Sequence, residues 1–265
     1  MTGFCSQEIH CESLGCGPDL VMVHGWAMHG GLLRKLAERL SSQYRVTLID
    51  LPGHGGSTPI ADYSLRPVVE RLVRAAPASA HWLGWSLGAL LALAVADEYP
   101  DRVRSLVMVA GTPRFTADGN WPGVDPGLLQ QMSVDLEQDY SGTVKRFIGL
   151  QLFAQEAPRS LARRIHEMVD ERPVPDPAAL RGGLALLRDV DARPALVTIQ
   201  KPVLAILGAR DRLIPKALAP WLRALNRGIE VHELPAAAHL PFITHCDETA
   251  GLIAEFLSVQ SQSQA

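Results

Sequence analysis

Gly84-Trp85-Ser86-Leu87-Gly88 is the part of the sequence whose residue types and spacing most directly indicate chemistry. This G-x-S-x-G pattern follows the apolar run Trp82–Leu83 and precedes leucines at helical spacing. At a sharp strand-to-helix turn the serine hydroxyl is exposed, because small residues two positions before and after it avoid backbone clashes. A helix N-terminus beside the hydroxyl favours developing negative charge. We therefore predict that Ser86 is a nucleophile.

A serine hydroxyl needs a base to react at neutral pH. In this strand–turn–helix arrangement an acid and then a histidine follow the serine along the chain. Asp211 follows the apolar run Val203–Gly208, and His239 follows Val231–Leu234. We predict that His239 takes the serine proton and that Asp211 orients the ring and stabilises the imidazolium. Alternatives stay open, since an aspartate after a strand is often a turn cap and His245 is a rival base.

Backbone donors must stabilise the oxyanion that forms on an attacked carbonyl group. The N–H of Leu87, directly after the nucleophile, is one candidate. The other is the N–H of Trp26, because His24-Gly25-Trp26 follows the buried run Leu20–Val23 and Gly25 lets the backbone turn tightly. Trp26 could instead be a core aromatic residue, and the two roles can coexist.

The glycine-rich segment Asp50–Ser57 resembles a phosphate-binding loop only superficially. It has no Lys-Ser/Thr pair after the glycines, and Pro52 interrupts it. We interpret it as a structural turn that braces the catalytic face, so Asp50 is not the predicted triad acid.

Short apolar runs alternate along the chain with apolar residues at helical spacing. This alternation predicts an α/β fold, with a mostly parallel twisted sheet and helices on both faces. Ligands in such folds bind beyond the carboxyl ends of the strands, where Ser86 is expected. The predicted strands are Leu20–Val23, Val46–Ile49, Trp82–Leu83, Leu106–Val109, Val203–Leu207 and Val231–Leu234.

One segment breaks the alternation, because no strand is evident from Pro113 to about Pro194. Prolines mark its edges and joints. We predict a helical cap of residues 113–192 inserted into a core of residues 1–112 and 193–265, with an ordinary helical connection as the alternative. The predicted cap helices are Pro126–Glu137, Thr143–Phe153, Ser160–Val169 and Pro177–Leu187.

The composition indicates a well-cored globular protein rather than a disordered chain or a nucleic-acid-binding protein. Of the 265 residues, 47% are hydrophobic and 20% are charged, and the net charge is -3. The uncharged run 75–96 is long enough to span a bilayer, but Pro77, Ser79 and His81 interrupt it, which favours a strand, a turn and a helix. Residues 1–17 show no secretory signal. We expect a cytoplasmic protein without a membrane segment.

The cysteines carry no clear metal signal. Cys5, Cys11 and Cys16 crowd the N-terminus, but their spacing is not that of a zinc site and no matching His/Cys cluster follows. We expect these residues and Cys246 to be reduced thiols, with a zinc or disulfide role as the alternative. A serine triad with backbone donors needs no metal or organic cofactor.

Together these motifs resemble the α/β-hydrolase superfamily over nearly the whole chain. A narrower resemblance is to the pimeloyl-[acyl-carrier protein] methyl ester esterases of biotin synthesis. The features that carry it are Trp26 after His24-Gly25, Trp82–Gly88, Phe115 with Trp121-Pro122-Gly123, Arg146-Phe147 with Leu150-Gln151, and His239–His245.

This resemblance implies an α/β-hydrolase fold with a cap and a serine carboxylesterase that frees the carboxylate of a carrier-bound pimeloyl chain. It implies the triad Ser86, Asp211 and His239, with Trp26 and Leu87 contacting the ester. The acyl channel would be lined by Phe147, Ile148, Gly149, Leu150 and Gln151. The acyl chain-length preference is not fixed by the sequence.

The residues of the predicted cap also suggest an acidic partner. Between Lys145 and Arg164 there are five basic residues, the others being Arg146, Arg159 and Arg163, against the single acid Glu156. Acyl carrier proteins are acidic, so such a patch could steer docking. Our hypothesis is that Arg146, Arg159 and Arg163 contact the carrier, and the alternative is a set of solvated helix faces.

Other functions remain to be weighed. A general short-chain carboxylesterase or thioesterase without a carrier is the main alternative, because pocket and cap decide the substrate. A non-catalytic ligand receptor could keep the same triad. Dehalogenases and epoxide hydrolases are disfavoured, since they use an aspartate where Ser86 stands. We expect a monomer.

Overall fold

The computed structural model describes residues 8–152 and 158–262, so Cys5, Phe153 and Glu156 lie outside the described residues. Seven strands in the described part form one sheet in the order β1-β3-β2-β4-β5-β6-β7. β1 runs antiparallel to β3, and the other neighbours are parallel. The strands are β1 (Cys11–Leu14), β2 (Asp19–Val23), β3 (Arg45–Ile49), β4 (Ala80–Trp85), β5 (Val103–Val109), β6 (Val203–Gly208) and β7 (Glu230–Leu234).

The six predicted strands are all present, each within a few residues of its expected bounds. β2 to β6 are recognisable because most of their residues are buried, as expected of a parallel sheet covered on both faces. β7, at the other edge of the sheet, is mostly not buried. β1 was not predicted. Its residues Cys-Glu-Ser-Leu are only partly buried at the antiparallel edge of the sheet, so they lack the apolar run that marks β2 to β6.

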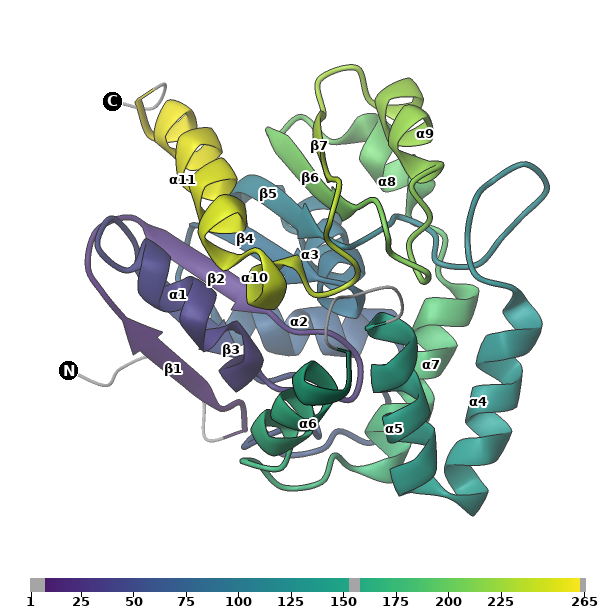
Figure 1. Ribbon diagram of the computed structural model, residues 1–265. Helices are drawn as coiled ribbons and strands as arrows, with labels where there is room; N and C mark the ends of the chain where they lie inside the picture. Colours follow the sequence, from purple (N-terminus) through teal and green to yellow (C-terminus); the bar gives the residue numbers. More distant parts are fainter. Residues whose placement is uncertain (1–7, 153–157, 263–265) are drawn as a thin grey trace.

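Helices cover both faces of the sheet (Figure 1). α1 (Arg34–Leu40) and α11 (Cys246–Gln262) contact each other on one face, and α2 (Leu65–Ala75), α3 (Leu87–Glu98) and α8 (Arg193–Thr198) lie on the other. α3 is buried from Leu87 to Ala96, which explains its uniformly apolar sequence. The uncharged run 75–96 is therefore a strand, a turn and a buried helix, as predicted. No helix of the described part is both long and apolar enough to cross a membrane.

The remaining helices connect or follow these elements. Two short 3-10 helices are η1 (Gly30–Leu33) and η2 (Pro100–Arg102), and α9 (Leu218–Leu225) and α10 (Pro241–Thr244) flank β7. Between β5 and β6 lie α4 (Pro126–Gln138), α5 (Tyr140–Gln151), α6 (Pro158–Val169) and α7 (Pro177–Asp189), which we call the cap helices. They gather at one end of the molecule (Figure 1).

Aspartates start three of the cap helices. Asp125, Asp139 and Asp176 accept hydrogen bonds from backbone N–H groups of the first turns of α4, α5 and α7. The two ends of the cap segment lie side by side, because Ala192 N donates to Pro113 O at 2.8 Å. This adjacency is compatible with an insertion, and the division of the chain at residues 113–192 stays a prediction.

The strand order reverses beside β2, where β3 pairs on one side and β4 on the other. Crevices at such a reversal, beyond the carboxyl ends of the strands, are the usual ligand sites of α/β sheets. The residues that follow β2 and β4 there are His24-Gly25-Trp26 and Ser86. The topology thus brings the predicted nucleophile and the predicted oxyanion segment to one place.

The Asp50–Ser57 turn braces this edge of the sheet, as predicted. The Asp50 carboxylate accepts from Gly30 N at 2.7 Å and from Gly56 N at 2.9 Å. His54 is fully buried in the turn, and its Nδ1 bonds to the Pro52 main-chain oxygen at 3.0 Å. Burial lowers the pKa of His54 to about 4. The ring is therefore neutral at pH 7.

A pH-dependent stability follows from this buried histidine. Its pKa is 6.5 when unfolded and about 4 when folded, so between these pH values the unfolded chain binds more protons and the fold loses stability as pH falls. We expect His54→Asn, which keeps a donor at the Nδ1 position, to remove up to about 3 kcal/mol of the pH-dependent loss between pH 7 and pH 4.

Urea unfolding at several pH values measures this effect. His232→Asn is the control, because His232 is partly exposed and bonds to Glu230 on the sheet edge. An unchanged pH slope in His54→Asn would contradict the prediction.

Candidate active site

Ser86 sits on a strained turn between β4 and α3. Its φ of 56° is unusual for a residue with a side chain, and such strain costs about 1–3 kcal/mol unless the surroundings enforce it. The surroundings do so through close backbone approach. A Cβ on Gly84 would collide with Gly88 O, and one on Gly88 would collide with the carbonyl oxygens of Val23 and His24. Glycine at both positions therefore allows the turn to form.

The structure brings Ser86, His239 and Asp211 together in one hydrogen-bonded line. His239 Nδ1 lies 2.7 Å from Asp211 Oδ2, and His239 Nε2 lies 3.0 Å from Ser86 Oγ. A carboxylate only accepts hydrogen bonds, so Nδ1 carries the proton and the Nε2 lone pair faces the serine hydroxyl. Ser86 is 4% exposed, Asp211 6% and His239 0%.

Asp211 is itself held by the backbone. Its Oδ1 accepts from Leu213 N at 2.8 Å and from Ile214 N at 3.0 Å. The carboxylate thus has protein partners on both oxygens. The turn-cap alternative describes part of what Asp211 does, and its other oxygen still reaches the imidazole.

The rival residues lie elsewhere. His245 Nδ1 bonds to the neighbouring Thr244 Oγ1 at 2.8 Å, and it directly precedes α11 as expected. Asp50 bonds to Gly30, Gly56 and His10. Within the described part of the chain, the residue that bonds to Ser86 is therefore His239 and not His245, and the carboxylate that bonds to His239 is that of Asp211 and not that of Asp50.

The predicted oxyanion donors flank Ser86. A Cβ added at Gly25 would lie 3.2 Å from Ser86 Cβ, so the chain turns past the nucleophile directly before Trp26. Leu87 is the first residue of α3, where a helix N–H has no partner within the helix. Leu87 thus adjoins Ser86 in sequence, and Trp26 directly follows a glycine packed against Ser86.

The Trp26 side chain connects this site to the cap helices. Its Nε1–H donates to Leu180 O of α7 at 2.8 Å, and its ring meets Phe147 of α5 edge-on, 4.9 Å between centroids. The ring is 1% exposed, so Trp26 is also a core aromatic residue. The two roles expected of it are sterically compatible. Leu180 was not predicted, because no sequence pattern signals a main-chain oxygen as a partner.

The segment Phe147–Gln151 presents different faces of α5. Phe147, Ile148 and Gln151 are 2%, 0% and 1% exposed, and Leu150 is partly buried. Gly149 is exposed, and a Cβ added there would meet no other atom within 4 Å. This follows from the 100° turn per helical residue, which cannot aim all of them at one channel. Gln151 Nε2 is buried and has no hydrogen-bond partner in the described part.

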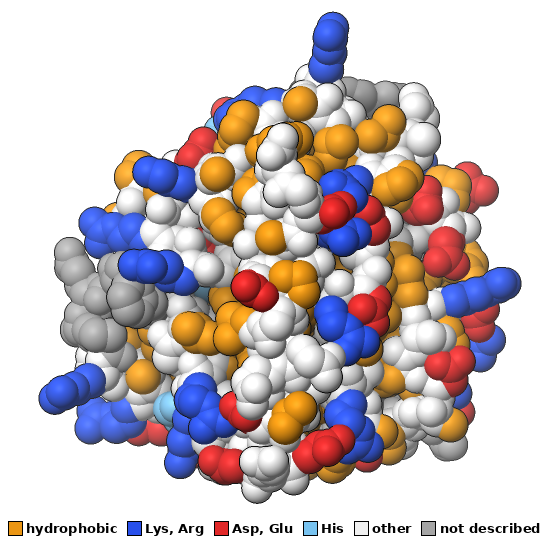
Figure 2. Space-filling view, turned by 90° about the vertical axis from the view of Figure 1, so that its right-hand side faces the viewer, with side chains coloured by type: hydrophobic (Ala, Val, Ile, Leu, Met, Phe, Trp, Pro, Cys, Tyr) orange, Lys and Arg blue, Asp and Glu red, His pale blue; other side chains and the backbone are white. Residues whose placement is uncertain are grey.

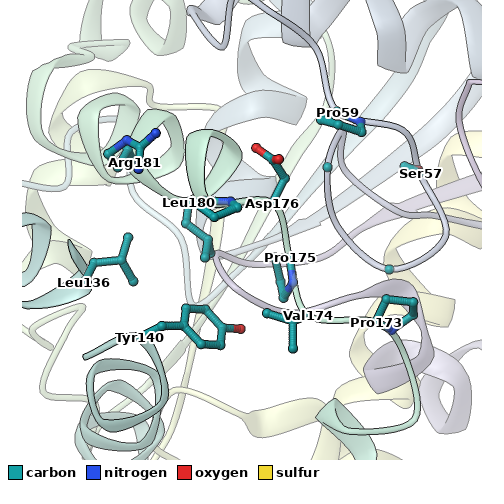
Figure 3. Close-up of a pocket in the computed structure, with 13 residues that line it drawn as sticks. Ser57, Pro59, Leu136, Tyr140, Pro173, Val174, Pro175, Asp176, Leu180 and Arg181 are labelled. Carbon is teal, nitrogen blue, oxygen red and sulfur yellow. The ribbon is translucent and has the colours of Figure 1, made fainter. Parts of the chain in front are cut away.

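A cavity of about 470 Å³ lies between the cap helices and the turn that follows β3 (Figure 3). Tyr140 points across it toward Val174 (Figure 3). It adjoins the site through Leu180, whose oxygen accepts from Trp26, but Ser86 is not in its lining. The lining comprises Gly53, Gly55, Ser57, Pro59, Leu136, Tyr140, Pro173, Val174, Pro175, Asp176, Pro177, Leu180 and Arg181.

The predicted carrier-binding arginines are exposed on α5 and α6. Lys and Arg side chains gather along the left edge of the face in Figure 2, whereas both signs mix over the rest. Arg146 is the most engaged of the three, because it bonds to Asp135 at 3.1 Å and to Thr143 at 2.9 Å. Arg163 lies 3.8 Å from Glu167. Arg159 is exposed near the start of α6.

Three of the four cysteines lie in the described part of the chain, and whether all four are reduced thiols stays a prediction. Cys16 and Cys246 are free, and burial raises the pKa of Cys246. The Cys11 Sγ lies 3.8 Å from the main-chain oxygen of Ile9, to which it donates. Across residues 8–152 and 158–262, no group of three or more His, Cys, Asp or Glu side chains is placed to hold a metal ion.

Comparison with known proteins places the chain in a family. The family model of the α/β hydrolase fold matches residues 18–245. The pimeloyl-[acyl-carrier protein] methyl ester esterase of Methylococcus capsulatus is 42% identical over 247 residues, covering 93% of this chain and 97% of the relative. The enzyme of that name from Edwardsiella ictaluri is 40% identical, covering 92% and 94%. The chain belongs to this esterase family of the α/β hydrolases.

Membership confirms the predicted family and fold, and it makes the chain a carboxylic ester hydrolase. Solved structures agree on the fold. An esterase from Exiguobacterium antarcticum superimposes with a TM-score of 0.84 at 23% identity, covering 94% of this chain and 95% of the other. A bromoperoxidase from Bacillus anthracis gives 0.86 at 19%, with the same coverage. These likenesses show the fold alone.

The crowded turn at Ser86 gives a mutational test of the site's geometry. We expect Gly88→Ala to lower the free energy of unfolding by about 1–3 kcal/mol, because the new Cβ overlaps backbone that cannot rotate away. Esterase activity should fall with it, since Ser86 must move.

Gly149→Ala is the matched control. Its Cβ meets nothing within 4 Å, and alanine in an exposed helix position should raise stability by up to about 1 kcal/mol. Thermal denaturation of both variants measures the contrast. Equal melting temperatures would show that the turn tolerates a side chain.

Proposed function

We propose that the enzyme hydrolyses the methyl ester of a pimeloyl chain bound to acyl carrier protein, a step of biotin synthesis, and that it works as a monomer in the cytoplasm. Relatives at 42% and 40% identity bear the name of this activity. The observation that carries the proposal is the buried hydrogen-bonded line from Asp211 through His239 to Ser86. It is the arrangement that turns a serine into a nucleophile.

In the first half-reaction Ser86 Oγ attacks the carbonyl carbon of the methyl ester. His239 Nε2 takes the hydroxyl proton as the bond forms, and Asp211 stabilises the imidazolium through Nδ1–H. The oxyanion accepts from the N–H groups of Leu87 and Trp26. The imidazolium then returns its proton to the methoxy oxygen, methanol leaves, and the acyl group remains on Ser86.

The second half-reaction repeats these roles with water. His239 takes a proton from the water as its oxygen attacks the acyl carbon, and the same donors hold the second oxyanion. Collapse of the intermediate breaks the bond to Ser86 Oγ, which regains the proton from His239. The products are the carboxylic acid of the carrier-bound chain, which loses its proton to solvent at neutral pH, and the unchanged enzyme.

The acyl channel of this proposal runs along residues 147–151 of α5, with Phe147, Ile148, Leu150 and Gln151 as its wall. Phe147 supports this route, since its ring touches Trp26 beside the nucleophile. The amide nitrogen of Gln151, which has no partner among the described residues, is a donor that a polar group of the bound chain can satisfy. Gly149, being exposed, would contribute through its lack of a side chain at the mouth of the channel.

The carrier partner of the proposal is acidic and docks on the exposed arginines of α5 and α6. Arg159 and Arg163 are suited to it because they are exposed and lie one helical turn apart. The positive charge of Arg146 is already partly neutralised by the carboxylates of Asp135 and Asp139. Its share in docking should therefore be the smallest of the three.

Ser86→Ala tests the chemistry. We expect turnover of pimeloyl-carrier methyl ester to fall roughly 10⁴–10⁶-fold, and covalent labelling by a fluorophosphonate to disappear. Ser105→Ala is the matched control, because Ser105 is also buried and bonded to a histidine, His81, at 2.8 Å. Labelling of the Ser86→Ala variant at the same rate as the parent enzyme would rule out Ser86 as the nucleophile.

Charge reversal tests the carrier. In Arg159→Glu/Arg163→Glu we expect KM for the carrier-bound ester to rise roughly ten-fold and the salt dependence of kcat/KM to weaken. Hydrolysis of a p-nitrophenyl ester should not change. Arg227→Glu, an exposed charge in the α9–β7 turn, is the control. Equal losses on both substrates would favour a general short-chain esterase without a carrier.

A further inference from the structure

The Trp85 side chain contacts the segment that carries the proposed base and the loop that precedes the proposed oxyanion donor Trp26. Trp85 ends β4 directly before Ser86 and is 1% exposed. Its Nε1–H donates to the main-chain oxygen of His239 at 3.0 Å. Its ring centroid lies 5.9 Å from that of His239 and 4.9 Å from that of Phe242. On another side, a Cβ added at Gly25 would lie 3.2 Å from the ring.

The hydrogen bond from Trp85 fixes the main chain at the proposed base. His239 belongs to the β7–α10 loop, residues 235–240, which is also tied to the segment that follows β6 by the bond from Arg210 N to Ala237 O at 2.9 Å. His239 is fully buried, so water cannot replace a lost partner of its carbonyl group. Without the indole N–H, the loop can satisfy that oxygen only by moving. Such a movement shifts Nε2 relative to Ser86 Oγ.

We propose that Trp85 is a positioning residue, whose indole N–H holds the His239 main chain so that Nε2 stays within hydrogen-bond reach of Ser86. The inference rests on the proposed roles of Ser86 and His239. An indole suits this task because its nitrogen only donates and does not titrate. The bond to the carbonyl oxygen therefore persists whether the imidazole is neutral or protonated.

Trp85→Phe removes the donor and keeps an aromatic ring. A second variant replaces Trp85 with 3-benzothienylalanine, which has the shape of tryptophan but sulfur in place of N–H. Trp82→Phe is the matched control. Trp82 is buried on the same strand and donates its Nε1–H to Arg102 O at 3.2 Å, at the opposite end of the sheet from the triad.

We expect Trp85→Phe to lower kcat on a p-nitrophenyl ester, and the rate constant of fluorophosphonate labelling, by roughly 10–100-fold, because misplacing a catalytic group by about 1 Å has effects of this size. KM should change less than about two-fold, since the binding wall stays in place. The 3-benzothienylalanine variant should lose as much as Trp85→Phe. Trp82→Phe should keep both rates within about two-fold of the parent.

Other outcomes overturn the inference. Full activity of the 3-benzothienylalanine variant would assign the effect to ring packing, and this variant alone decides if Trp85→Phe does not fold. Equal losses in Trp85→Phe and Trp82→Phe would indicate a general loss of stability. If Ser86→Ala abolishes labelling while Trp85→Phe does not slow it, the positioning role fails and the proposed function stands. If Ser86→Ala keeps labelling, the proposed function fails first.

Discussion

The buried line of hydrogen bonds from Asp211 through His239 to Ser86 is the interaction on which the rest of the site depends. A positive charge on a buried imidazole is energetically costly unless a carboxylate pairs with it and that carboxylate has hydrogen-bond partners of its own. The N–H groups of Leu213 and Ile214 meet that condition for Asp211. The partners are 28 and 153 residues apart in sequence. The parallel sheet brings them together, because the carboxyl ends of strands β4, β6 and β7 lie on the same side of it.

Position, rather than residue type, distinguishes His239 from the other buried histidines. His81 also bonds to a serine, Ser105, but its Nε2 has no partner in the described part and no carboxylate supports it there. Burial lowers its pKa to about 4. His24 bonds to the backbone through both ring nitrogens, and burial lowers its pKa to about 3. The His24 and His81 rings are therefore neutral at pH 7 and have a structural role. His239, which lies between a carboxylate and a hydroxyl group, is better placed than either of them for proton transfer.

The sequence predicts the sheet and the triad because both leave local signals. Apolar runs mark the buried strands, and the glycines around Ser86 mark a turn that side chains would block. What it does not predict depends on distant atoms. β1 lacks an apolar run because it lies at the sheet edge. The bonds of Trp26 to Leu180 and of Trp85 to His239 end on main-chain oxygens, which every residue type has, so the sequence does not indicate them.

The same limit applies to side chains whose environment is set by folding. The basic run in the cap suggests free charges, yet Arg146 bonds to Asp135, eleven residues earlier, because α4 and α5 pack together. Spacing along the chain predicts which residues share an element, and packing decides which of them share a surface.

The loop after β2 joins the chemistry to the cap helices. Trp26 Nε1–H bonds to Leu180 O on α7, and His29 Nε2 bonds to Met168 O on α6 at 2.9 Å. His29 Nδ1 accepts from Gly31 N at 3.1 Å, so Nε2 carries the proton and donates a hydrogen bond to the Met168 oxygen. The loop that presents the proposed oxyanion donor is therefore also the loop to which two cap helices are anchored. A displacement of α6 or α7 would strain these bonds, which lie in the same loop as the proposed oxyanion donor, so a movement of the cap helices would affect the proposed site.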